Sequence, residues 1–74
     1  MPNRIEIHPD VCNGRPVIKN TRITVSSILG FLSAGDSIEE VLQSFPTLKR
    51  EDILACIAYA QRATESRSTY CLTA

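Results

Sequence analysis

The residues of this 74-residue chain that could do acid–base or metal chemistry are few and scattered. Glu39–Glu40 and Glu51–Asp52 are adjacent pairs, so on a helix their carboxylates diverge and do not form the converging pair that acid–base catalysis needs. His8 is the only histidine in the sequence, so no second histidine stands at metal-ligand spacing. The sequence also has no glycine-rich phosphate-binding pattern. We therefore expect no enzyme activity, no cofactor and no metal site.

The residues best suited to bind a ligand are basic. Arg15, Lys19 and Arg22 lie in a turn-rich N-terminal arm, and Lys49 and Arg50 stand before the apolar stripe of the last predicted helix. Lysine and arginine contact DNA phosphates and so fix the position of a protein on the duplex. These five residues are the predicted DNA contacts, if the chain binds DNA.

The charge distribution leaves two interpretations open. Eight basic residues balance eight acidic ones, which argues against a strongly electrostatic nucleic-acid binder. Residues 1–24 have four basic and two acidic side chains (+2), residues 25–54 have two and five (−3), and the rest have two and one (+1). Either the basic front half pairs with the acidic middle, within the fold or across a dimer, or it forms an anion site. Glu51 and Asp52 weigh against DNA binding, because an exposed first helical turn would hold them against phosphate.

The cysteines and the N-terminal sequence bear on the compartment. Cys12, Cys56 and Cys71 are odd in number and lack CxxC spacing, so they indicate neither a disulfide framework nor a zinc site. No apolar run has the length of a signal peptide or of a membrane span. We therefore expect a reduced, cytoplasmic protein without a membrane segment.

The first third of the chain predicts short extended segments separated by turns. Ile5 and Ile7 alternate with polar residues, which is typical of a strand with one buried face. Asn13–Gly14 and Asn20–Thr21 are turn dipeptides that tolerate positive φ, and Val17–Ile18 between them is a second extended pair. Residues 1–24 are therefore predicted to form a short β arm.

The rest of the chain predicts three amphipathic helices. The first begins after Thr24 as N-cap and ends at Gly35. The second begins with a capping box of Ser37 and Glu40 and stops at Pro46. The third has an apolar stripe over residues 53–64.

These elements predict one small domain over residues 1–64, followed by a flexible tail over residues 65–74. The predicted fold is mainly α, a three-helix homeodomain-like or winged helix-turn-helix core with a short N-terminal β arm. The isoleucines and valine of the arm either cover this core or pair with another chain. The predicted core consists of Val25, Ile28, Leu29, Leu32, Ile38, Val41, Leu42, Phe45, Leu48, Ile53, Leu54 and Ile57.

Several runs of the sequence resemble a small prokaryotic family catalogued as domain of unknown function 433. The longest is residues 7–23, with its Gly-Arg-Pro and Thr-Arg-Ile motifs, and shorter matching runs cover 34–41, 45–48, 51–53 and 58–60. The resemblance implies a helix-turn-helix core behind a β arm. It also implies a role as the antitoxin partner of a PIN-like ribonuclease toxin.

The sequence departs from the family pattern at three positions. Asn13 and Asn20 stand where the family usually has glycine, which fits positive φ at both turns at some cost in strain. Lys49 stands where the family usually has a threonine or serine that caps the last helix. That cap is therefore expected to be lost or passed to Thr47.

The antitoxin hypothesis assigns partner contacts to the C-terminal part of the chain. PIN-type nucleases hold metal in a carboxylate cluster, and an arginine from a partner can pair with those carboxylates. Arg62 and Arg67 are the candidate arginines, with Tyr70 and Leu72 as apolar anchors. The alternative is that both arginines are solvated residues at a helix end.

The sequence therefore supports three compatible hypotheses. The first is a non-enzymatic antitoxin that neutralises a PIN-like ribonuclease by direct binding. The second is a DNA-binding regulator of its own operon. The third is a structural module that self-associates without nucleic acid, through pairing of the β arm between chains. A homodimer or higher homo-oligomer is expected in each case, because so short a chain buries little surface alone.

Overall fold

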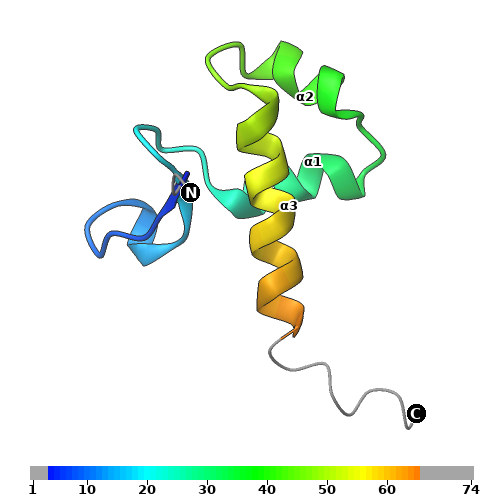
Figure 1. Ribbon diagram of the computed structural model, residues 1–74. Helices are drawn as coiled ribbons and strands as arrows, with labels where there is room; N and C mark the ends of the chain where they lie inside the picture. The colour runs from blue at the N-terminus through cyan, green and yellow to red at the C-terminus, as the bar shows by residue number, and fades with distance from the viewer. Residues whose placement is uncertain (1–3, 66–74) are drawn as a thin grey trace, which may run out of the picture.

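The computed structural model describes residues 4–65 as a mainly α fold with a short N-terminal β arm, which confirms the predicted fold class (Figure 1). The long third helix runs across the first, and the second lies near its N-terminal end. None of the helices in residues 4–65 has the length and apolar character to cross a membrane. The elements in order are β1 (Ile5–Glu6), the 3-10 turn η1 (Cys12–Gly14), β2 (Val17–Ile18), α1 (Val25–Ser33), α2 (Ile38–Ser44) and α3 (Arg50–Glu65).

The ends of α1 are fixed by local hydrogen bonds that the sequence predicts. The Thr24 hydroxyl accepts a hydrogen bond from the backbone N–H of Ser27 at 3.1 Å. Gly35 follows the helix with a φ of 106°, and the N–H of Asp36 returns to the carbonyl of Phe31 at 3.1 Å. This is a Schellman motif, and its left-handed residue explains the glycine.

The start of α2 and the turn that follows this helix are also fixed by local hydrogen bonds. The Ser37 hydroxyl accepts from the N–H of Glu40 at 3.1 Å, and the Glu40 carboxylate accepts from the N–H of Ser37 at 2.7 Å. This reciprocal pair is the predicted capping box. The helix ends at Phe45, before Pro46, and the N–H of Leu48 donates to the carbonyl of Phe45 at 2.9 Å. The short turn gives α2 and α3 the predicted helix-turn-helix layout.

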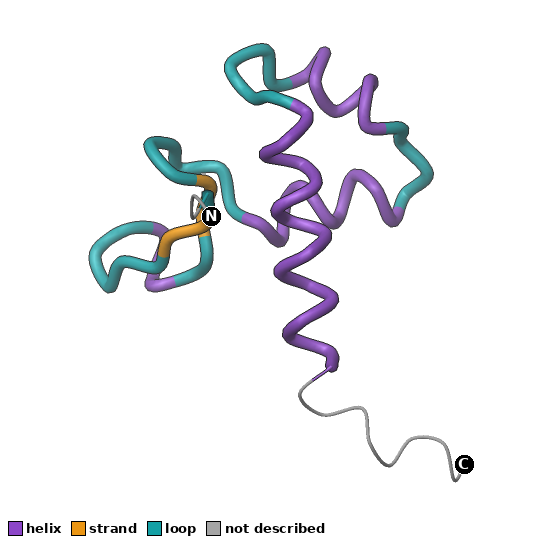
Figure 2. Tube along the Cα trace, viewed as in Figure 1, coloured by secondary structure: helices purple, strands orange, loops and turns teal. Residues whose placement is uncertain are grey.

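The β arm folds onto the helices of its own chain (Figure 2). Ile5 pairs with Ile18 in a two-stranded antiparallel sheet, and both side chains are buried in the same core as the helices. Asn13 and Asn20 have φ values of 58° and 65°, as their types predict, and Cys12 also has a positive φ, of 52°. Ile5 is therefore part of the protomer's own core and is not free to pair with another chain.

The core confirms most of the predicted apolar residues and corrects two. Ile28, Ile53 and Cys56 are fully buried, whereas Leu54 and Ile57 are 46% and 41% exposed. The prediction failed because residues 53–58 of α3 are apolar all round, so the helical period could not select the buried side. The buried side of α3 is set by its contacts with α1, α2 and β1.

Candidate functional site

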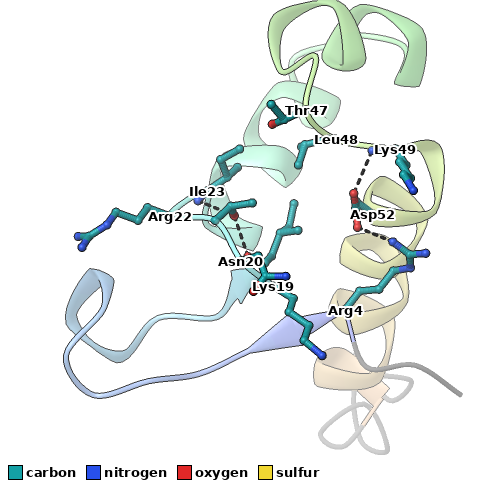
Figure 3. A pocket seen from close by; sticks show the side chains of 11 residues that line it. Arg4, Lys19, Asn20, Arg22, Ile23, Thr47, Leu48, Lys49 and Asp52 are labelled. Carbon is teal, nitrogen blue, oxygen red and sulfur yellow. Dashed lines mark hydrogen bonds and ion pairs between the residues drawn. The ribbon is translucent and has the colours of Figure 1, made fainter.

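A cleft of about 640 Å³ separates the turn after β2 from the first turn of α3 (Figure 3). Residues 18–23 form one wall and residues 47–49 form the other. Arg4 and Asp52 complete the lining near the N-terminal end of α3. We call this feature the basic cleft, because Lys19, Arg22 and Lys49 line it and Asp52 is its only acidic lining residue.

The β-arm wall of the basic cleft is a tight turn. Asn20 occupies the left-handed region, and the Thr21 hydroxyl donates to the carbonyl of Ile18 at 2.7 Å and accepts from the N–H of Ile23 at 3.0 Å. The N–H of Lys19 donates to the carbonyl of Arg4 at 2.8 Å. Because side chain and backbone both close this turn, they fix the backbone positions from which Lys19 and Arg22 extend.

The opposite wall is held by Asp52. This residue is only 8% exposed, and its carboxylate accepts from the Arg4 guanidinium at 2.8 Å and from the backbone N–H of Lys49 at 2.9 Å. The second bond supplies the backward half of a capping box, in which Asp52 accepts from the N–H of the residue before α3. The expectation that Asp52 is exposed to a ligand is wrong, because Arg4 and this N–H occupy its carboxylate. Of the two outcomes expected for the cap at position 49, the structure agrees with its loss, since the Thr47 side chain forms no hydrogen bond within residues 4–65.

Three basic side chains of the cleft have no partner among the described residues. Within residues 4–65, the side chains of Lys19, Arg22 and Lys49 form no hydrogen bond or ion pair, whereas Arg4 is neutralised by Asp52. Figure 3 shows the three free side chains spread around the rim of the cleft instead of converging on one point. A rim of this kind suits an extended anion, which can contact successive groups along its length.

The sequence of the chain matches a known protein family over most of its length. The family model described as "Protein of unknown function (DUF433)" matches residues 5–60. The chain belongs to the DUF433 family. This confirms the resemblance seen in the sequence, and the family match covers both walls of the basic cleft.

Two known proteins are similar to this DUF433 chain. The uncharacterized protein y4eO of Sinorhizobium fredii is 36% identical over 53 residues, which are 72% of this chain and 24% of that protein. A crystal structure of a DUF433 member protein from Anabaena variabilis matches with a TM-score of 0.80 at 36% identity, over 86% of this chain and 63% of that one. The chain thus spans about a quarter of the first relative and less than two thirds of the second.

The DUF433 chain does not gather all five predicted DNA contacts in one place. Arg15 is exposed after η1 and does not line the basic cleft. Arg50 is also outside it, because its guanidinium donates to the Glu39 carboxylate at 3.0 Å. A backbone hydrogen bond and then Arg50 lower the pKa of Glu39 below its usual value. Arg50 is therefore committed to α2, and Lys19, Arg22 and Lys49 remain as a group.

The predicted partner-binding residues are placed only in part. Arg62 is exposed near the end of α3 and lines a second hollow of about 430 Å³, which we call the arm hollow, together with Ile7 and Tyr59. Arg67, Tyr70 and Leu72 lie outside the described residues. Arg62, the one described member of the set, therefore lies beside the β arm. It lines the arm hollow and does not line the basic cleft.

Within residues 4–65, no group of three histidine, cysteine or acidic side chains is placed to hold a metal ion. Burial, and secondarily Asp52, raises the pKa of the Cys56 thiol to about 11, so this cysteine is a protonated core residue at neutral pH. The structural use of Cys56 is packing.

Sequence reasoning missed Arg4 and misjudged Asp52. An acidic residue three positions after the N-cap, the residue just before a helix, is a signal for a capping hydrogen bond. Lys49 and Asp52 have this spacing, so the sequence contained the signal. The pairing of Asp52 with Arg4 spans 48 positions and has no local signal. Only the packing of β1 against α3 brings the two together.

Proposed function

We propose that the chain is a non-enzymatic DNA-binding regulator that holds the phosphate backbone in the basic cleft. The observation that supports this proposal best is the grouping of Lys19, Arg22 and Lys49 in one cleft with no partner among residues 4–65. Free cations around an open rim fit successive phosphates of a strand, and each contact releases counterions. The formal net charge of zero is compatible with this, because Asp52, the one acidic residue among the described residues that line the cleft, is neutralised by Arg4, while Glu51 lies outside the lining.

The position of the basic cleft in the helix-turn-helix layout also favours DNA. It includes the residues that lead into α3, the helix that would approach the duplex in such a layout. The exposed side of α3 is poor for reading bases, because it holds Leu54 and Ile57. We therefore propose that α3 presents its N-terminal end, and not its side, to the duplex. Binding of this kind contacts mainly phosphates and is steeply salt-dependent.

A salt titration of duplex binding tests the proposal. Fluorescence anisotropy with labelled DNA from upstream of the chain's own gene should show affinity that falls with salt. Replacing Lys19, Arg22 or Lys49 by alanine should weaken binding and reduce the salt slope by about one each. Arg50→Ala is the matched control, because Arg50 is paired with Glu39 outside the cleft. Absence of binding at low salt, or an equal loss in the control, would exclude the basic cleft as a DNA site.

We propose antitoxin activity as a second function, because the arm hollow has the composition of a protein-binding site. It combines Arg62, the aromatic ring of Tyr59 and Ile7, whose side chain is 55% exposed. Arginine and tyrosine are enriched among residues that dominate protein interfaces, and arginine pairs in bidentate fashion with carboxylates. A PIN-like ribonuclease with an acidic metal site is a partner of matching chemistry. An antitoxin that represses its own operon would use both surfaces.

Titration calorimetry with a purified PIN-like ribonuclease tests the second function. Arg62→Glu should weaken binding, because it places a carboxylate against an acidic site, and Arg67→Glu tests the contribution of residues beyond 65. Lys19→Glu is the control, since it alters the basic cleft alone. If no complex forms, or if Arg62→Glu binds as tightly as the unmodified chain, the arm hollow is not the antitoxin site.

A further inference from the structure

The exposed side of α3 is apolar at its centre. Leu54 and Ile57 are 46% and 41% exposed, and the half-buried Ala58 lies one turn from Leu54. Exposed polar residues lie at both ends of this apolar strip. Together, the strip and these polar residues form what we call the outer face of α3: Glu51, Leu54, Ile57, Ala58, Gln61 and Arg62. It lies opposite the side that buries Asp52, Ile53 and Cys56. A helix face with two large apolar side chains in its middle fits another protein surface.

The charges of this face complement a second copy of it. Glu51 and Arg62 lie at opposite ends of the face, 11 positions or about 16 Å apart along the helix axis. At about 100° per residue, their side chains project on the same edge of the face. If two α3 helices cross antiparallel about a two-fold axis, Glu51 of each helix meets the partner's Arg62. A two-fold axis produces this ion pair twice.

The same arrangement aligns the apolar centre. The midpoint between Glu51 and Arg62 falls between Cys56 and Ile57, so Ile57 meets the partner's Ile57 near the axis. Leu54 then lies over the partner's Ala58, whose small side chain permits close approach of the two helices. Within residues 4–65, neither Glu51 nor Arg62 has an ion pair or side-chain hydrogen bond that would have to be broken first.

We propose that the outer face of α3 is the interface between two copies of this chain, packed antiparallel with two Glu51–Arg62 ion pairs. A small chain with a limited core gains buried apolar area by this association. The proposal replaces the β arm as the pairing element, because Ile5, Val17 and Ile18 already fill the protomer's own core. It does not depend on the proposed functions and leaves the basic cleft open. Because it pairs Arg62 with Glu51, a dimer of this kind competes with ribonuclease binding through Arg62.

Sedimentation equilibrium of the full chain across a range of concentrations tests the apolar centre. The unmodified chain should dimerise, and Leu54→Asp should be a folded monomer, because Leu54 is not part of the core. Ile7→Asp is the matched control: Ile7 is also exposed, but it lies on the β arm. A chain that stays monomeric at millimolar concentration, or a dimer that survives Leu54→Asp but not Ile7→Asp, would overturn the proposal.

A charge exchange tests the antiparallel register. Glu51→Arg and Arg62→Glu should each weaken dimerisation by about tenfold, because each places like charges side by side twice. The double variant should restore it. A double variant that dimerises no better than the single ones would overturn the register. Ribonuclease binding through Arg62 should not return in the double variant, so failure of the dimer and failure of the antitoxin function give different results.

Discussion

The basic cleft borders the N-terminal end of α3 and differs in almost every physical property from the outer face of that helix. Asp52 and Leu54 are two positions apart, yet Asp52 is 8% exposed and Leu54 is 46% exposed. The cleft holds three free cations beside a buried carboxylate, whereas the outer face presents apolar side chains at its centre. The proposed anion-binding surface and the proposed dimer interface thus lie on different sides of α3.

The difference shows how a small chain can carry charge where ligand binding needs it. The Asp52 carboxylate accepts hydrogen bonds from Arg4 and from the N–H of Lys49. It therefore anchors β1 to α3 and does not repel an anion at the rim of the cleft. Glu39 is likewise paired with Arg50. The net charge of zero therefore conceals a cleft with three cations that have no partner among residues 4–65.

The largest expected effect separates the two sides of α3. Ile53→Ala should lower the free energy of unfolding by about 3 kcal/mol, because Ile53 is fully buried and its loss leaves a cavity. Leu54→Ala, measured at a concentration where the chain is monomeric, should change it by less than about 0.5 kcal/mol. Urea denaturation followed by circular dichroism measures both. Similar losses in the two variants would show that Leu54 belongs to the core after all.

Asp52→Ala should have the next largest effect. It leaves the N–H of Lys49 uncapped and Arg4 unpaired, which should lower the free energy of unfolding by about 2 kcal/mol. Asp52→Asn keeps an acceptor for the cap but removes the charge, so about half of this loss is expected. Thermal denaturation of the two variants separates cap from ion pair, and an unchanged midpoint in both would contradict the anchoring role of Asp52.

The smallest effect concerns the cation that lies outside the cleft. Arg50→Ala should raise the pKa of Glu39 toward its usual value, but the backbone hydrogen bond should keep that pKa lowered. The lowered pKa stabilises the fold above the usual range and this contribution is lost as the pH falls, so Arg50→Ala should weaken that pH dependence. An NMR titration of the Glu39 carboxyl measures it. Lys49→Ala is the control, and an equal shift there would mean that Arg50 is not the specific partner.

Local features of this fold were predictable from the sequence because their causes are local. The N-caps at Thr24 and Ser37, the left-handed glycine at Gly35 and the positive φ of Asn20 each follow from residues within a few positions. The same is true of the helix stop at Pro46. The family resemblance rests on sequence runs such as residues 7–23 and 34–41 and is confirmed by the match over residues 5–60.

Features that depend on distant residues were not predictable. The Arg4–Asp52 ion pair spans 48 positions, and no spacing rule indicates it. The exposure of Leu54 and Ile57 depends on which side of an apolar helix the other elements cover. For the candidate site, the basic residue types were a sufficient signal, but only the fold shows that Lys19, Arg22 and Lys49 share a cleft while Arg15 and Arg50 do not.

The most direct test of this account is an NMR titration of the full, isotope-labelled chain with a short DNA duplex at low salt. We expect amide shifts concentrated in residues 18–23 and 47–49, the two walls of the basic cleft. We expect little change at Leu54 and Ile57, on the outer face of α3. Shifts centred on that outer face, or no shifts at all, would contradict the claim that the basic cleft is the anion-binding surface of this protein.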